Sequence, residues 1–332
     1  MDGTKGNGRK NPPAWLPPIF QDSRFLYGLI IAFFIFYLIT GIWVFGLLIG
    51  LGILSLVALE FLQGASEHGV KSEIKETAIA LLLAVVVWFG AGFILQTSSP
   101  LNAIVSCSLL PHVQRGDMVI LQGGQITAPH ENISSVQGLE AAQVYQNGKF
   151  VSVVNGSIYS YCSLHGSDGI CASFISSPAN FTEKHGGLTF GYERCEIVYP
   201  KTGMRQFGPC VSWLEVNNNR YYENLNNSIV VYQPGKDEYY SRVGDIIHRA
   251  FILLTASDDG KTDFLTKGDN NPIFDMQVYD EASGTGNRPV EVSRSKGRVI
   301  LQIPYLGYLK LFISPSAIPT PDGCDRQYAK WS

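Results

Sequence analysis

The sequence predicts N-terminal transmembrane α-helices followed by an all-β domain that carries a large β-rich insertion. Charged residues make up only 16% of the 332-residue chain, below the roughly 25% typical of soluble domains. The deficit is local, because residues 25–62 contain Glu60 as their only charged side chain and residues 78–95 contain none. After Pro100, short runs rich in Val, Ile and Tyr are broken by Gly, Asn, Asp and Pro, which is the pattern of short strands.

The apolar residues 25–62 are too many for a single membrane crossing. At about 1.5 Å per residue, one helix would reach roughly 57 Å, about twice the hydrocarbon thickness of a bilayer. We therefore expect a helical hairpin that turns near Thr40 and Gly41, and one more span over residues 78–95. The predicted membrane region covers residues 25–98 and contains three transmembrane helices.

Basic residues in the segment 1–24 orient the chain. Lysine and arginine collect on the cytoplasmic side of membrane spans, and the segment contains Lys5, Arg9, Lys10 and Arg24. A cytoplasmic N-terminus followed by three crossings places the rest of the chain outside the cell. We expect a multi-pass protein of the plasma membrane whose β domain is extracytoplasmic.

Residues 124–228 have the features of a secreted domain. This segment contains four N-glycosylation sequons, beginning at Asn132, Asn155, Asn180 and Asn226. It also contains four of the six cysteines: Cys162, Cys171, Cys195 and Cys210. An even number of cysteines in an extracellular segment favours disulfides, although the sequence leaves all three pairings open. A metal site that includes Cys162, His165 and Cys171 is the alternative, but we expect no metal and no organic cofactor.

The insertion interrupts a smaller β core, expected over residues 99–123 and 229–313. A polar and loose C-terminal tail is expected over residues 314–332. No long amphipathic helix is expected among the strands. The candidate strands are Met118–Leu121, Val151–Val154, Cys195–Tyr199, Val211–Val216, Ile229–Tyr232, Asp245–Leu254, Arg298–Ile303 and Tyr308–Phe312.

A serine-rich stretch follows the membrane region closely. It reads Ser106-x-Ser108-x-x-Pro111, with Gly116-Asp117 and an apolar Met-Val-Ile run after it. The stretch resembles the nucleophile motif of type I signal peptidases, which is written S-x-S-M-x-P with a Gly-Asp several residues on. Leu109 stands here in place of the methionine. By itself the motif is weak, because a serine-rich turn that leads into a strand has the same composition.

Three further motifs follow in the order of that family. The first is Ile229-Val-Val-Tyr232 with Ile246-Ile-His-Arg249, which resembles a segment of the archaeal and endoplasmic-reticulum signal peptidases. The second is Thr266-Lys-Gly-Asp-Asn-Asn271 with Asp275 beyond it, and the third is the stretch 297–307, which resembles the closing G-x-V…P-Y-x-G strands. The resemblance covers residues 105–312 apart from the insertion, and it implies a signal-peptidase-like catalytic domain.

The resemblance implies Ser108 as the nucleophile and His248 as the general base. A serine hydroxyl needs a base to take its proton, and neutral histidine suits that task near pH 7. The alternative bases are His112, just past the serine motif, and Lys267, because bacterial relatives use a serine–lysine pair.

A base needs a carboxylate that orients it, and an oxyanion needs fixed donors. Asp269 and Asp275 are the candidate carboxylates, and the sequence does not decide which of them contacts His248. Turn formation explains them equally well, because Gly-Asp-Asn-Asn is turn chemistry. The Ser108 backbone N–H and the Ser106 hydroxyl are the expected oxyanion donors, with the Cys107 side chain pointing away from both.

The implied function is removal of signal peptides from secretory preproteins at the outer membrane surface, in an archaeon. The expected partners are such preproteins, membrane lipid and the protein translocation channel. A net charge of −3 argues against a nucleic-acid partner, and spans almost free of ionisable residues argue against a transporter. The main alternative is a non-catalytic, membrane-anchored surface glycoprotein built on a decayed peptidase core. An autoproteolytic repressor is a weaker alternative, because the chain lacks a basic DNA-binding segment.

Overall fold

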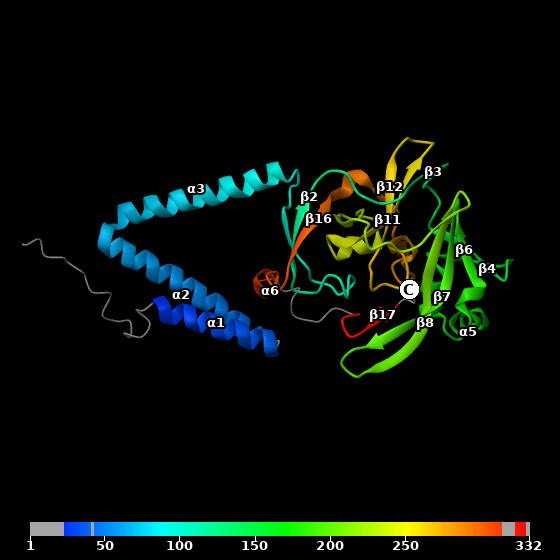
Figure 1. The fold of residues 1–332 in the computed structure, drawn as a ribbon, viewed down its shortest axis with the longest axis horizontal. Coiled ribbons are helices and arrows are strands. Elements are labelled where there is room, and N and C mark those ends of the chain that lie inside the picture. Colours follow the sequence, from blue (N-terminus) through cyan, green and yellow to red (C-terminus); the bar gives the residue numbers. More distant parts are fainter. Residues whose placement is uncertain (1–22, 41–42, 314–322, 330–332) are drawn as a thin grey trace, which may run out of the picture. The chain divides into compact units, whose positions relative to one another are not determined.

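The computed structural model describes residues 23–40, 43–313 and 323–329, which form two units (Figure 1). One unit contains the helices α1 (Ser23–Thr40), α2 (Trp43–His68), α3 (Val70–Ile94) and α6 (Tyr308–Ile313). The other unit runs from Leu95 to Gly307 and includes the C-terminal residues 323–329. The insertion and the predicted core as far as Gly307 therefore lie within one compact unit.

Two of the described helices are long and apolar enough to cross a membrane. These stretches are Val44–Ser66 and Val70–Ile94, whereas the apolar part of α1 covers only Arg24–Tyr37. Helix α1 ends at Thr40 and α2 begins at Trp43, so the first apolar run is divided where predicted, and the turn itself lies outside the described residues. The apolar part of α1 is short, so the described residues contain two helices of spanning length where three crossings were expected.

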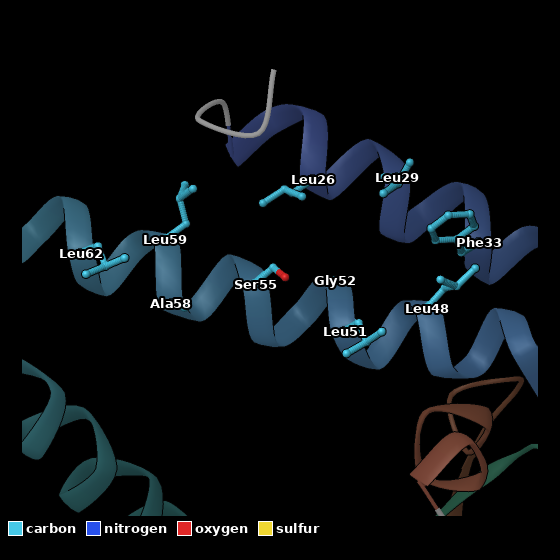
Figure 2. A pocket seen from close by; sticks show the side chains of 10 residues that line it. All are labelled: Leu26, Leu29, Phe33, Leu48, Leu51, Gly52, Ser55, Ala58, Leu59 and Leu62. Carbon is cyan, nitrogen blue, oxygen red and sulfur yellow. The ribbon is translucent and has the colours of Figure 1, made fainter. Parts of the chain in front are cut away.

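Helices α1 and α2 pack against each other through small and aliphatic side chains. A Cβ on Gly52 would lie 2.9 Å from Cγ1 of Ile30, so only glycine allows this approach of the two helices. Figure 2 shows leucines of both helices around a cavity of about 510 Å³, with Ser55 as the one polar side chain in its lining. An apolar lining of this kind suits hydrocarbon and offers nothing for chemistry.

The segment Tyr308–Phe312 is a helix, so the strand predicted there is wrong. Strand β16 ends at Ile303, Pro304 follows it, and Tyr305 adopts a positive φ of 63°. Proline cannot continue a strand ladder, and the turn redirects the chain before Leu311 and its neighbours form α6. The helix belongs to the unit of the apolar helices and not to the β core.

The first sheet of the β unit contains the predicted core. Its path is β1-β2-β16-β10-β11-β12-β15, with β3 added parallel to β11. The strands are β1 (Leu101–Ala103), β2 (Met118–Gln122), β3 (His130–Ile133), β10 (Ile229–Tyr232), β11 (Ile246–Ala256), β12 (Thr262–Lys267), β15 (Val290–Glu291) and β16 (Ser295–Ile303). The pairing brings segments before and after the insertion into one sheet, since β2 pairs with β16.

The second sheet is formed almost entirely by the insertion, with the long β7–β8 hairpin at its centre (Figure 1). Its path is β5-β4-β6-β7-β8-β9. The strands are β4 (Ala141–Gln146), β5 (Lys149–Asn155), β6 (Phe181–His185), β7 (Leu188–Tyr199), β8 (Met204–Val216) and β9 (Asn219–Tyr221). Two short helices, α4 (Ile158–Leu164) and α5 (Gly169–Ser176), interrupt these strands and are capped by Ser157 and Asp168. A small hairpin, β13 (Tyr279–Asp280) with β14 (Thr285–Gly286), stands apart from both sheets.

Three disulfides join all six cysteines, in the pairs Cys107–Cys324, Cys162–Cys171 and Cys195–Cys210. The last two pairs select one of the three pairings that the sequence left open in the insertion. The metal site considered at Cys162, His165 and Cys171 is therefore wrong, because two of its ligands are a disulfide. His165 instead contacts Glu281.

The expectation of a loose C-terminal tail is wrong for residues 323–329, while 314–322 and 330–332 lie outside the described residues. Residues Gln327–Ala329 form β17, which pairs with β7 of the insertion sheet. Cys324 is bonded to Cys107, beside the predicted nucleophile. The hydropathy pattern could not reveal this, because a three-residue strand held by a disulfide has no hydrophobic period.

Candidate functional site

The imidazole of His248 lies against the carboxylate of Asp275. Nδ1 of His248 is 2.7 Å from Oδ2 and 2.9 Å from Oδ1 of Asp275, and both side chains are buried. A carboxylate accepts a proton, so this contact assigns the hydrogen to Nδ1. The other ring nitrogen, Nε2, then has a free lone pair, as a general base requires.

Asp275 is held by donors on its other sides. Tyr232 and Thr266 donate from their hydroxyls to Oδ2 of Asp275, at 2.9 and 2.5 Å. Burial, together with the Asp275 charge, raises the pKa of Tyr232 well above its ordinary value, so its hydroxyl keeps its proton. The side chain of Asn287 donates to the backbone carbonyl of Asp275 at 3.0 Å. These contacts hold the carboxylate against the His248 ring.

Asp269 has a different partner. Nε and Nη2 of Arg249 donate to its two oxygens at 2.8 and 2.7 Å, which is a bidentate ion pair. His112 contacts the same carboxylate at 3.1 Å through Nδ1. Arg249 also donates to the carbonyls of Leu225 and Asn227, so this pair ties β11 to the chain ahead of β10. Among the two candidate aspartates, Asp275 is the one on His248.

The predicted nucleophile lies in a loop between β1 and β2. Oγ of Ser108 is 3.1 Å from Oγ of Ser106. The loop is anchored by Leu109, which is fully buried, and contains a cis peptide bond before Pro111. Cys107, between the two serines, is directed into its disulfide with Cys324.

Residues after β12 hold the carbonyl of Ser108. The Asn270 N–H donates to it at 2.8 Å. A Cβ on Gly268 would lie 2.6 Å from the same oxygen, so a side chain at that position is excluded. Lys267, the last residue of β12, pairs with Arg249, which follows His248 on β11. The Ser108 loop is thus held just beyond the last residue of β12, and His248 lies one residue before the last pair that β11 makes with β12.

No hydrogen bond joins Oγ of Ser108 to the His248 ring in the described part of the chain. The hydroxyl of Ser108 is shared with Ser106 instead. Contacts between a nucleophile and its base are often long in structures without substrate and shorten when substrate binds. The geometry provides an oriented base at His248 and a fixed loop at Ser108.

The two competing bases have other partners. His112 is bonded to Asp269, and 40% of its side chain is exposed. Lys267 is buried with its Nζ 3.2 Å from the carbonyl of Gly268 and 3.5 Å from Glu223. Burial lowers the pKa of Lys267 to about 8, while Asp269 and Asp275 oppose that shift. Lys267 lies directly opposite Arg249 on the neighbouring strand, so the two side chains start on the same face. His248 precedes Arg249, so its side chain starts on the opposite face.

Within the described residues, one group could offer metal ligands, formed by Glu193, Cys195 and Cys210. Both of its thiols are used in the disulfide, so no thiolate remains for a metal. We therefore assign no metal to this group.

No family model matches the chain, and no curated protein is similar to it. The resemblance to signal peptidases consequently rests on the quoted motifs and on the contacts among them. The motif letters also contain residues whose roles sequence reasoning missed, namely Tyr232, Arg249, Thr266, Gly268 and Asn270. Each of them stands inside a quoted motif, so its place in the motif could have marked it as part of the site.

Substitution of each aspartate should destabilise the protein to a different extent. In Asp269→Asn, the buried Arg249 charge loses its partner, and we expect the free energy of unfolding to fall by about 3–5 kcal/mol. Asp275→Asn removes no cation's only partner, so a smaller loss is expected. Chemical unfolding of both detergent-solubilised variants measures the difference, and an equal loss in the two would contradict this assignment.

Lys267 makes stability depend on pH in a defined window. Its folded pKa of about 8 lies below the ordinary 10.5, so between these values the unfolded chain binds more protons and stability rises with pH. Lys267→Met has no such group. Between pH 8 and 10.5, the unfolding free energy of the wild type should therefore rise by about 3 kcal/mol relative to that of the variant. Denaturant titrations across that range test this, and a constant difference would refute it.

Proposed function

We propose that the chain is a membrane-bound serine endopeptidase that removes signal peptides from secretory preproteins. The observation that carries the proposal is the His248–Asp275 pair, which leaves Nε2 of His248 free at the end of the strand pair where the Ser108 loop is held. The motif resemblance to the archaeal and endoplasmic-reticulum type of signal peptidase supports the same assignment. Ser108 is the nucleophile, His248 the base and Asp275 the residue that orients the base.

The proposed reaction is peptide-bond hydrolysis through an acyl-enzyme. Nε2 of His248 takes the proton of the Ser108 hydroxyl as Oγ attacks the carbonyl carbon before the cut. Nε2 then gives that proton to the leaving amine of the mature protein. A water molecule, deprotonated by the same nitrogen, attacks the ester carbon, and Nε2 returns that proton to Oγ of Ser108 as the ester bond breaks and the signal peptide leaves. His248 carries a positive charge only in between, and the Asp275 carboxylate stabilises it.

The developing oxyanion is assigned to two donors, the Ser108 N–H and the Ser106 hydroxyl. Ser106 is suited to this role because its Oγ lies 3.1 Å from the attacking atom. A donor already in place is worth roughly 3 kcal/mol of transition-state stabilisation. The loop can supply both donors without rearrangement because Asn270 fixes its backbone.

The membrane location of the substrate agrees with the apolar helices. Signal peptides present small residues at a cleavage site just beyond an apolar helix, at the membrane surface. Helices α2 and α3 would confine the enzyme to that surface and raise the effective concentration of substrate. We further propose the outer side of a plasma membrane, with α1 as a third crossing. Three disulfides support an oxidising compartment.

The four sequons favour the second candidate, a non-catalytic surface glycoprotein. Their acceptor side chains, Asn132, Asn155, Asn180 and Asn226, are all exposed. Glycans at these positions fit either function, however, whereas the buried polar contacts around Asp275 have no use in a decayed site. Without a catalytic role, these buried polar groups would lower the stability of the fold and have no function that explains their presence.

Cleavage of a preprotein tests the proposal. We expect the wild type in liposomes to cut a secretory preprotein at a site preceded by small residues. Ser108→Ala and His248→Ala should each lower kcat by at least about 10³-fold, because either change removes the nucleophile or its base. His130→Ala is the matched control, since His130 is exposed on β3 and should leave the rate unchanged. Equal cutting by Ser108→Ala would exclude the proposed chemistry.

A further inference from the structure

The insertion encloses the segment that carries Asp275. Ile273, Phe274 and Met276 are buried in the same hydrophobic cluster as the insertion's Phe181 and Phe190. The rings of Phe190 and Phe274 lie 5.1 Å apart. The Val211 N–H of the insertion donates to the carbonyl of Pro272 at 2.8 Å. The two residues that flank Asp275 therefore pack into the core of the insertion, while the Asp275 side chain itself contacts His248.

Gln277 closes the turn that begins at Asp275. Residues Asp275–Gln277 form one 3-10 turn, η4. The Gln277 side chain reaches back so that its Oε1 accepts the Phe274 N–H at 2.8 Å. Its backbone carbonyl accepts the hydroxyls of Ser157 and Ser160, at 2.9 and 2.8 Å. Both serines belong to the start of α4 in the insertion, so the insertion holds the backbone of this turn directly.

The amide end of Gln277 enters a buried polar cluster of the insertion. Nε2 donates to Glu183 and to the hydroxyl of Tyr192. Glu183 is fully buried, and its other oxygen accepts the Ile158 N–H at 2.9 Å. A Cβ on Gly156 would lie 3.0 Å from the carbonyl of Gln277, so the insertion approaches this residue as closely as glycine permits.

The cluster is anchored by a buried pair of a histidine and a carboxyl group. Nε2 of His185 lies 3.0 Å from Oε1 of Glu183, and Nδ1 lies 2.7 Å from the carbonyl of Leu139. A carbonyl only accepts, so Nδ1 carries a hydrogen, and the other nitrogen shares a proton with the Glu183 carboxyl. Both side chains are fully buried. Separating the two members would leave an uncompensated buried group, so the pair stays in this arrangement.

We propose that Gln277 and Glu183 are positioning residues for the base. The buried Glu183–His185 pair fixes Gln277, the turn closed by Gln277 fixes Asp275, and Asp275 sets the orientation of His248. The insertion thereby becomes the support of the catalytic carboxylate. This inference rests on the proposed function for its effect on catalysis, but its geometric part is independent of that function.

The expected effect is on kcat and not on KM. Displacement of a catalytic group by about 1 Å can cost 10²-fold in rate, and Gln277 touches no substrate. Gln277→Met keeps the length of the side chain and removes all three side-chain hydrogen bonds. We expect it to lower kcat for preprotein cleavage by about 10- to 100-fold with KM unchanged.

A swap variant tests whether the pair acts together. Gln277→Glu places a second carboxylate beside Glu183 and should lower kcat further than Gln277→Met. Combining it with Glu183→Gln restores one amide and one carboxylate in reversed order, so the double variant should recover at least tenfold over Gln277→Glu. Gln206→Met, at an exposed position on β8, is the matched control and should leave kcat unchanged.

A second measurement does not depend on activity. The hydrogen on Nδ1 of His248, held by Asp275, should give a downfield proton resonance in the full-length chain in detergent. We expect this signal in the wild type and in Gln206→Met, and its loss in Asp275→Asn and Gln277→Met. If Gln277→Met cleaves like the wild type and keeps the signal, the positioning role is wrong. If the wild type cleaves no preprotein, the proposed function fails, and the resonance alone then decides the positioning role.

Discussion

The site depends on Asn270, the residue that holds the serine loop. Its N–H donates to the carbonyl of Ser108, and its Nδ2 donates to the carbonyl of Cys107. The same side chain donates to the Arg326 carbonyl and accepts the Tyr328 N–H. Buried backbone groups of an irregular loop must find partners, and one buried amide supplies them here. Asn270 thereby joins the nucleophile loop, the β12 turn and the C-terminal segment.

The alternation of side chains along β11 separates two buried carboxylates. His248 and Arg249 are neighbours in sequence, so their side chains start on opposite faces of the strand. Each face receives its own aspartate: Asp275 on His248 and Asp269 on Arg249. Two carboxylates at one place would raise each other's pKa and compete for the same cation. Because Arg249 pairs with Asp269 separately, Asp275 is left to the imidazole and to the hydroxyls of Tyr232 and Thr266.

The sequence predicted those parts that have a periodic or motif signal, such as the strand Ile229–Tyr232 and the hairpin turn near Thr40. Ser106, Ser108, His248 and the two aspartates were named from motifs, but the motifs do not show which partner each aspartate takes. That choice depends on strand register and on the turn at Gln277, which are set by tertiary packing. The Cys107–Cys324 bond was missed for a similar reason, because the two residues lie 217 positions apart and the local composition around Cys324 indicated a tail.

The central claim is that Ser108 attacks the scissile carbonyl with His248 as its base. Acid quenching of the enzyme during preprotein cleavage, followed by peptide mass mapping, tests it most directly. We predict an ester between the signal peptide's new C-terminal carboxyl and the Ser108 hydroxyl, absent in Ser108→Ala. Cleavage that proceeds with no adduct at Ser108, or with the adduct on another residue, would contradict the account.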